Sequence, residues 1–142
     1  ALPISTNNGV QISLDAPLGI FVSGIRDELV QVFENLIENA IKYGKIGGRV
    51  EVAVRYGKVD GDVILSVADF GAGIEPADVP RLTERFYRAS SGNQPTAKGT
   101  GLGLAIVKHI LSRHQAQLSI QSVPGQGATF SAIFRQSRQF VG

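Results

Sequence analysis

The chain has 142 residues, of which 43% are hydrophobic and 18% charged, and its net charge is +2. This size and apolar content suit a folded domain with its own core and exclude an intrinsically disordered chain. The small net charge, without interleaved aromatic and basic residues, gives no support to nucleic-acid binding, and the absence of cysteine excludes disulfides and thiolate metal sites.

The chain contains no methionine, so its first residue is not a translation start. We therefore expect a piece of a longer protein, with residues 1–142 forming a single domain. No apolar run approaches the roughly 18 residues of a membrane-spanning helix, and no signal peptide is visible. A membrane tether would have to lie in the remainder of the protein.

The first half of the chain predicts strands on either side of one long helix. Val10–Asp15 alternates apolar and polar residues, which is typical of a strand, and Ile20–Val22 predicts a short second one. Across Arg26–Tyr43, apolar residues recur every three or four positions, which predicts a helix with one buried face. Arg49–Tyr56 alternates again and Val63–Val67 follows a glycine-containing turn, so these two segments predict a hairpin.

The middle of the chain is less regular. The segment Glu75-Pro-Ala-Asp predicts the start of a short helix that carries Arg81–Phe86. Ala89–Lys98 has little to bury, and we expect it to be mobile. Leu102–Arg113 again has apolar residues at helical spacing and predicts a second strong helix.

Two strands are predicted to close the chain, at Leu118–Ser122 and Thr129–Phe134, around the turn Pro124-Gly-Gln-Gly127. Strands and helices are thus mixed along the chain, and consecutive strands pair as hairpins. This order predicts an α+β fold, a two-layer α/β sandwich in which a mixed, mostly antiparallel sheet packs on about three helices.

Two asparagines stand four residues apart on the long helix. Asn35 and Asn39 therefore share one flank beside the apolar stripe, and Lys42 follows three residues later. Amide oxygens can ligate Mg²⁺, and an ammonium group meets a phosphate as a point charge. The alternative is an ordinary polar flank, because asparagine is only mildly unfavourable in helices.

Asp69 ends an apolar strand and is followed by Phe-Gly-Ala-Gly-Ile74. A carboxylate at a strand end, on a pocket floor, can accept a hydrogen bond from the amino group of a base, and apolar surroundings would make that bond selective. Gly71 and Gly73 would let the backbone come close to a ring. The alternative is an ordinary strand-to-loop turn, for which aspartate and glycine are standard.

A second glycine-rich segment, Lys98-Gly-Thr-Gly-Leu-Gly103, opens the second predicted helix. Free backbone N–H groups at a helix start form an anion site, to which Lys98 adds positive charge. The spacing matches neither the dinucleotide fingerprint nor the Walker phosphate loop, so these two site types are disfavoured. A flexible hinge in close contact with a helix is the open alternative.

The segment Glu84-Arg-Phe-Tyr-Arg88 is a dense charged and aromatic cluster beside the stretch expected to be mobile. An arginine there could swing onto a terminal phosphate, while Phe86 and Tyr87 would bury their rings. A surface turn that packs its aromatic side chains is the alternative. His109 and His114 are not spaced from each other, or from a pair of carboxylates, as metal ligands are. We expect both to be ordinary helix-surface residues.

Taken together, these motifs resemble the catalytic ATP-binding domain of bacterial sensor histidine kinases. Glu34–Tyr43 is similar to the N box, and Asp69–Ile74 is similar to the first glycine box. Glu84–Arg88 is similar to the F box. Lys98–Ala105 and Gly125–Phe130 are similar to the second and third glycine boxes. The resemblance covers roughly residues 8–136 and implies the Bergerat (GHKL) fold of gyrase, Hsp90 and MutL, with a flexible ATP lid. Arg81–Arg88 and Ile106–Leu111 are similar to phosphate-sensing kinases of the PhoR type.

The resemblance implies a role for each matching residue of the base and metal sites. Asp69 would read the adenine amino group. Asn39 would be the main Mg²⁺ ligand, with Asn35 assisting. Lys42 would face the phosphates, and Tyr43 would lie near the adenine.

The resemblance also implies residues around the phosphates. Arg88 would touch the γ-phosphate and, with Asn39, act in catalysis, and Thr129 would support the base pocket through a hydrogen-bond network. The other nucleotide-binding positions that it implies are Gly71, Gly73, Ile74, Arg85, Phe86, Tyr87, Lys98 and the hinged lid residues Gly99, Thr100, Gly101, Leu102 and Gly103.

One departure from the family pattern concerns the phosphate acceptor. Family kinases phosphorylate a histidine on a separate helical dimerisation domain, within a His-Glu/Asp motif followed by proline, and these residues contain no such segment. His109 and His114 lie in the wrong element. We therefore predict the donor half of the reaction: the domain binds ATP·Mg²⁺ and gives the γ-phosphoryl group to a histidine on the dimerisation domain of the same protein, from which it passes to a response-regulator receiver domain.

The resemblance further implies a cytoplasmic domain that is monomeric when isolated and belongs to a homodimer tethered to the bacterial inner membrane. Two alternatives stay open. One is a degenerate, nucleotide-free docking module, which would show no nucleotide-dependent thermal shift. The other is a different GHKL-type ATPase, which would turn over ATP without a histidine-bearing partner.

Overall fold

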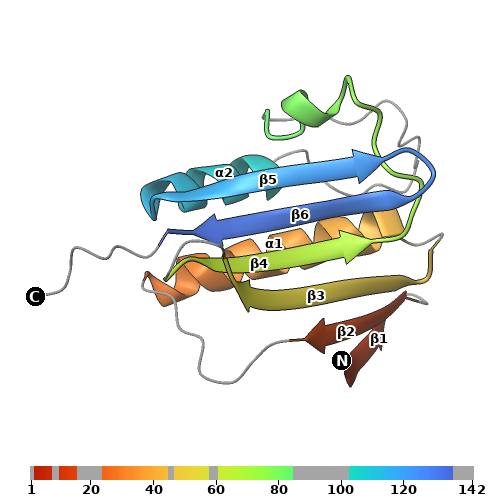
Figure 1. Ribbon diagram of the computed structural model, residues 1–142, viewed down its shortest axis with the longest axis horizontal. Coiled ribbons are helices and arrows are strands. Elements are labelled where there is room, and N and C mark those ends of the chain that lie inside the picture. Colours follow the sequence, from red (N-terminus) through yellow and green to blue (C-terminus); the bar gives the residue numbers. More distant parts are fainter. Residues whose placement is uncertain are drawn as a thin grey trace, which may run out of the picture.

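The computed structural model describes residues 2–7, 10–15, 24–44, 47–57, 61–84 and 103–135. The elements in these ranges are β1 (Leu2–Asn7), β2 (Val10–Asp15), α1 (Arg26–Gly44), β3 (Arg49–Tyr56), β4 (Val63–Asp69), the 3₁₀-helix η1 (Val79–Arg81), α2 (Gly103–Arg113), β5 (Ala116–Val123) and β6 (Gly127–Phe134). The strands form one six-stranded sheet in the order β1-β2-β3-β4-β6-β5 (Figure 1).

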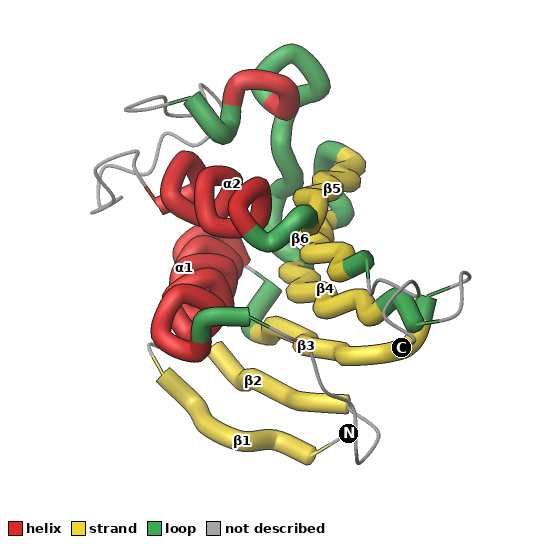
Figure 2. The backbone as a smooth tube through the Cα atoms, turned by 90° about the vertical axis from the view of Figure 1, so that its left-hand side faces the viewer, coloured by secondary structure: helices red, strands yellow, loops and turns green. Residues whose placement is uncertain are grey.

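The sheet is mixed and mostly antiparallel. Only β2 and β3 run parallel, and the other neighbouring pairs are antiparallel. Both α1 and α2 lie on the same face of the sheet, as Figure 2 shows. The predicted two-layer α/β sandwich is therefore confirmed for the described part of the chain, in which two α-helices and one 3₁₀-turn stand where about three helices were expected.

The two long helices and the β3–β4 hairpin lie where the sequence predicted them. The short helix expected from Glu75 is not an α-helix: residues 75–84 form successive turns closed by N–H groups that bond to the carbonyl three residues earlier, as Asp78 does to Glu75. Pro76 and Pro80 have no N–H group to donate, so the backbone hydrogen bonds that an α-helix would need at these two positions cannot form. The expected strand Ile20–Val22 and the stretch Ala89–Lys98 lie outside the described residues, and the edge strand β1 was not predicted.

The core lies between the two helices and the inner face of the sheet. Phe130 of β6 is the largest of its fully buried side chains. Its other fully or nearly fully buried members come from both layers: Val32, Leu36, Ala40, Val50, Val52, Val67, Ile74, Val107 and Leu111. Neither α-helix among the described residues combines the length and the apolar character that crossing a bilayer would need.

Strand alternation decides which face each residue of β4 occupies. Val63, Leu65, Val67 and Asp69 occupy alternate positions, and all four are buried. Val67 pairs in register with the core residue Phe130, so this set faces the helices. Asp69 therefore ends β4 on the inner face, directly beneath the helical layer.

Candidate functional site

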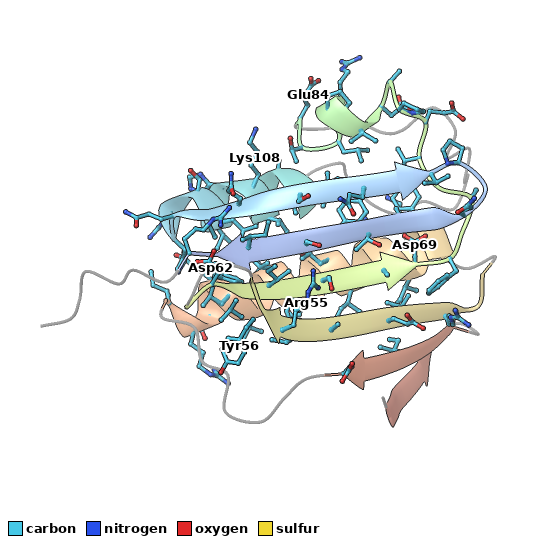
Figure 3. All side chains as sticks on the ribbon, viewed as in Figure 1. Arg55, Tyr56, Asp62, Asp69, Glu84 and Lys108 are labelled. Atoms are coloured by element: carbon cyan, nitrogen blue, oxygen red, sulfur yellow. The ribbon has the colours of Figure 1, made fainter. Side chains whose placement is uncertain are left out.

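Asp69 is a buried acid at one end of the central strand β4 (Figure 3), and its residue is 3% exposed. Its Oδ1 accepts a hydrogen bond from the N–H of Gly71 at 3.0 Å. Its Oδ2 is buried and has no hydrogen-bond partner among the described residues. An unpaired buried carboxylate oxygen is costly to a fold, so this atom is the strongest candidate for contact with a ligand.

Burial raises the pKa of the Asp69 carboxyl above its ordinary value, because the charged form loses its hydration. The backbone N–H groups of Gly71 and Ala128 oppose this rise by stabilising the carboxylate. Between pH 3.8, the ordinary value, and the raised value, the folded chain binds more protons than the unfolded chain. The contribution of Asp69 to the free energy of unfolding therefore falls as the pH rises through this window.

The pH dependence of stability offers a direct test of this burial. We expect the free energy of unfolding of the wild-type chain, minus that of an Asp69→Asn variant, to decrease as the pH rises above 3.8 and to level off once Asp69 is ionised in the folded chain. Urea titrations of both proteins at a series of pH values measure this difference. A difference that increased with pH would contradict the assigned environment, because it would mean that folding favours the ionised carboxyl.

The loop that follows Asp69 packs tightly against the end of α1. A Cβ added at Gly71 would collide with the carbonyl oxygen of Tyr43 and lie 3.2 Å from the Cα of Gly44. Only glycine allows so close a backbone approach. The approach is to the backbone of α1, and the predicted approach of this position to a ring stays a prediction. Phe70 lies against the guanidinium of Arg49, whose Cζ is 4.0 Å from the ring centroid. The loop, the end of α1 and the start of β3 therefore form one packed unit around Asp69.

The asparagines of α1 differ in their surroundings. The side-chain Nδ2 of Asn39 is buried and has no hydrogen-bond partner among the described residues. Asn35 donates from Nδ2 to the carbonyl oxygen of Gly103, the first residue of α2, at 3.4 Å. Further along the same helix, Lys42 Nζ lies 5.3 Å from the centroid of the Tyr43 ring.

Helix α1 thus connects two of the predicted motifs. Asn35, Asn39 and Tyr43 follow one another at intervals of four residues, so they lie on one flank. One end of this row touches Gly103, and the other end touches the loop at Gly71. The structure therefore brings together Asp69, Gly71 and Tyr43 at one end and Asn35 with Gly103 at the other, with the unpaired amide of Asn39 between them.

Several predicted site residues lie outside the described ranges, and their roles stay predictions. They are Arg85, Phe86, Tyr87, Arg88, Lys98, Gly99, Thr100, Gly101 and Leu102. Within the described ranges, Ile74 is 1% exposed and belongs to the core. The whole residue is therefore covered, and its N–H already donates to Ser122 Oγ. Ile74 supports the loop from within the core and offers no surface to a ligand, whereas Gly73 beside it is half-buried.

Thr129 does not occupy the position predicted for it. The register of β4 and β6 places Ala128 opposite Asp69 and Thr129 opposite Ala68. Because side chains alternate between the two faces of a strand, Thr129 projects from the face away from Asp69. The predicted hydrogen-bond network through Thr129 is therefore wrong, and the residue of β6 that lies opposite Asp69 is Ala128.

Sequence reasoning missed Ser122, whose hydroxyl accepts a hydrogen bond from the N–H of Ile74 at 2.7 Å. Ser122 was predicted only as the end of a strand. No motif in the printed sequence marks it, since a serine on a strand beside a turn is common. Its role follows from the meeting of two segments separated by 48 residues.

Comparison with known proteins shows the family of this chain. The model of the family described as "Histidine kinase-, DNA gyrase B-, and HSP90-like ATPase" matches residues 24–138. The phosphate regulon sensor protein PhoR of Pseudomonas aeruginosa is 46% identical over 134 residues, which are 94% of this chain and 30% of that protein. The sensor-like histidine kinase SenX3 of Mycolicibacterium smegmatis is 40% identical over 125 residues, 88% of this chain and 32% of that protein.

Solved structures show the same likeness. The mycobacterial sensor histidine kinase MprB superposes with a TM-score of 0.75 at 29% identity, covering 87% of this chain and 82% of that one. Full-length ShkA in complex with AMPPNP superposes with a TM-score of 0.74 at 28% identity, covering 89% of this chain and 26% of that one. The chain spans about a third of the length of the curated relatives it matches. It belongs to the family of histidine kinase-, DNA gyrase B- and HSP90-like ATPases, as a Bergerat-fold ATP-binding domain of the kind found in sensor histidine kinases.

Proposed function

We propose that this domain binds ATP with Mg²⁺ and donates the γ-phosphoryl group to a histidine on a separate dimerisation domain of the same protein. The observation that carries this function is the buried Oδ2 of Asp69, which has no partner among the described residues. The family membership of the chain implies ATP binding, and the AMPPNP complex of the similar protein ShkA supports a nucleotide ligand.

The adenine end of the site follows from the two oxygens of Asp69. Oδ1 is occupied by the N–H of Gly71, so Oδ2 is the oxygen that can accept a hydrogen bond from the exocyclic amino group of adenine. A purine that presents a carbonyl oxygen at this position would meet the carboxylate with an acceptor instead of a donor. The site should therefore select adenine over guanine by leaving the wrong base unpaired.

The phosphate end follows from α1 and the start of α2. Gly44 lies nine positions after Asn35, a rise of about 14 Å along an α-helix, which suits a nucleotide lying along α1 from Asp69 toward Gly103. The amide oxygen of Asn39, with Asn35 assisting, would hold Mg²⁺, which neutralises phosphate charge when bound. Lys42 adds a positive charge on the same side, and the N–H groups at the start of α2 suit an anion.

The chemistry required of this domain is positioning, because phosphoryl transfer needs little covalent participation by the protein. A nitrogen of the acceptor imidazole forms a bond to the γ-phosphorus. The bond from that phosphorus to the bridging β,γ-oxygen breaks, the electron pair leaves with ADP, and the proton on the other imidazole nitrogen passes to solvent. Arg88, which lies outside the described residues, is proposed to contact the γ-phosphate during this step.

The proposed partners follow from the same assignment. They are the histidine-bearing dimerisation domain and, after it, the receiver domain of a response regulator. The similar proteins PhoR and SenX3 are sensor proteins about three times the length of this chain, which supports a longer protein. We propose that this protein is a homodimer with this part on the cytoplasmic side of the inner membrane. We propose no nucleic-acid partner.

Phosphoryl transfer can be measured directly with labelled ATP. We expect this chain to gain no stable label by itself and to label a histidine-bearing dimerisation domain of the longer protein when the two are mixed with ATP and Mg²⁺. The label should be acid-labile, as a phosphoramidate is, and should disappear when the acceptor histidine is replaced by glutamine.

Two other results would each replace the proposal. If saturating ATP left the melting temperature unchanged, the domain would be a docking module, because a ligand at 100 times its Kd should add about 2.7 kcal/mol to the free energy of unfolding. If the chain alone hydrolysed ATP rapidly and the acceptor domain had no effect, it would be a GHKL ATPase of another kind.

A further inference from the structure

Ser122 of β5 joins the end of the sheet to the loop that follows Asp69. Its Oγ accepts a hydrogen bond from the N–H of Ile74 at 2.7 Å. The same Oγ lies 3.2 Å from the carbonyl oxygen of Gly127 and 3.5 Å from that of Ile74. A hydroxyl has one proton to donate, and the shorter contact makes Gly127 its acceptor. One side chain therefore ties the loop to both β5 and β6.

Ser122, Ala128 and Asp69 lie in one row across the sheet. Ser122 pairs with Ala128 of β6, and Ala128 pairs with Asp69 of β4. Residues paired in register project from the same face, so all three face the helical layer. The loop leaves β4 at Asp69 and reaches Ser122 two strands away at Ile74. It therefore crosses the beginning of β6, where the backbone of Gly127 lies against Asp69 and Phe70.

The β5–β6 turn holds the same loop through its backbone. The N–H of Gly125 donates to the carbonyl oxygen of Ala72 at 2.6 Å. Gly127 has a φ of +105°, and a Cβ added there would collide with the carbonyl oxygen of Asp69. The turn and the loop therefore interlock, with contacts at Asp69, Ala72 and Ile74.

We propose that Ser122 is a positioning residue of the nucleotide site. Its hydroxyl fixes the far end of the loop, whose near end carries the Gly71 N–H that occupies Oδ1 of Asp69. By holding the loop down, Ser122 keeps that N–H in place and leaves Oδ2 for the base. This inference rests on the proposed function, since it names a residue that acts on the base through Asp69.

The test compares Ser122→Ala, Ser122→Thr and Ser119→Ala in this chain. Ser119 is the matched control, because it lies in the same strand but on the opposite face, where it pairs with Ser131. We expect Ser122→Ala to raise the Kd for ATP about tenfold, the size of effect that one lost buried hydrogen bond produces. Ser122→Thr, which keeps the hydroxyl, and Ser119→Ala should each stay within about twofold of wild type.

Two further measurements separate positioning from a general loss of structure. Titration with inorganic triphosphate probes the phosphate end alone, and Ser122→Ala should leave its affinity unchanged. The ¹³C chemical shift of the Asp69 carboxyl followed against pH should show a changed pKa in Ser122→Ala and an unchanged one in Ser119→Ala. A loss of packing without repositioning would weaken ATP and triphosphate together.

The possible failures are distinguishable. If the wild-type chain bound no ATP, the proposed function and this inference would both be overturned. If wild type bound ATP and Ser122→Ala bound it equally well, only the role of Ser122 would be overturned. The same conclusion would follow if Ser119→Ala weakened ATP binding as much as Ser122→Ala, or if Ser122→Ala weakened triphosphate binding in step with ATP.

Discussion

The Asp69→Asn variant is expected to lose ATP binding while its nucleotide-free form becomes more resistant to unfolding. An aspartate offers two acceptor oxygens, one for the N–H of Gly71 and one for the base. An asparagine offers one acceptor oxygen and one NH₂ group that can only donate. Whichever way the amide is turned, its NH₂ group faces either the N–H of Gly71 or the amino group of the base, and two donors cannot bond. We expect the Kd for ATP to rise at least about a hundredfold, because a site built around a hydrogen bond discriminates strongly when that bond is broken.

The gain in stability has a separate cause. Burial raises the pKa of Asp69, so the fold favours the uncharged carboxyl, and asparagine resembles that form. Removing the ionised group should therefore increase the free energy of unfolding at neutral pH. Calorimetric titration with ATP and urea unfolding of the free chain measure the two effects. Tighter or unchanged ATP binding, or a less stable free chain, would contradict the assignment.

Asp62 provides the matched control for Asp69. The two acids stand at opposite ends of β4 (Figure 3) and are both buried, at 4% and 3% exposure. Asp62, however, accepts a hydrogen bond from Arg135 Nη1 at 2.8 Å, and Nη2 of the same arginine donates to Gln117. Asp62→Asn should therefore lower the free energy of unfolding, by about 1 kcal/mol because Arg135 is half-exposed, and leave ATP affinity unchanged.

The Asn39→Ala variant is expected to lose the Mg²⁺-dependent part of ATP binding. The side-chain Nδ2 of Asn39 has no hydrogen-bond partner among the described residues, so alanine removes no hydrogen bond made by that group and is the better helix former. The free energy of unfolding should change by less than about 1 kcal/mol. The affinity for ATP should fall at least about a hundredfold with Mg²⁺ present, because the phosphate charge would then lack its main protein anchor.

Ligand fragments and chelation separate Asn39 from Asp69. Adenosine carries no phosphate, so Asn39→Ala should bind it as wild type does, whereas Asp69→Asn should not. Adding a chelator should weaken ATP binding to wild type and have little further effect on Asn39→Ala. Asn35→Ala is the control from the same flank, and we expect it to weaken binding less. If Asn35→Ala proved as severe as Asn39→Ala, or if Asn39→Ala kept its response to Mg²⁺, the assignment of the main ligand would be wrong.

Local periodicity in the sequence was enough to predict the main elements. The predicted helices Arg26–Tyr43 and Leu102–Arg113 each lie within one residue of the observed bounds of α1 and α2. The segments that became β3 and β4 were predicted as a hairpin, and they pair antiparallel. These predictions succeed because burial of one face imposes a period of 3.6 on a helix and 2 on a strand, and each period is visible within a single segment.

Residues of the site could be predicted where their chemistry is local. Asp69 at a strand end with glycines after it, and Asn35 and Asn39 four apart, are patterns within a few residues of one another. Where the sequence was ambiguous, backbone chemistry decided: the prolines at 76 and 80 replaced a predicted helix with a series of turns.

Only the tertiary structure decided which residues meet across the sheet. The sequence placed Thr129 at the base pocket, but the residue opposite Asp69 is Ala128, one position earlier. A shift of one position along a strand moves a side chain to the other face of the sheet. The bond from Ile74 to Ser122 and the pairing of Asp62 with Arg135 join residues 48 and 73 positions apart. No local pattern encodes such contacts, because they arise from strand register and from which loops the closed sheet brings together. The sequence by itself therefore determined the elements and singled out the candidate ligand groups, and the packed sheet determined which of those groups are buried and which are hydrogen-bonded.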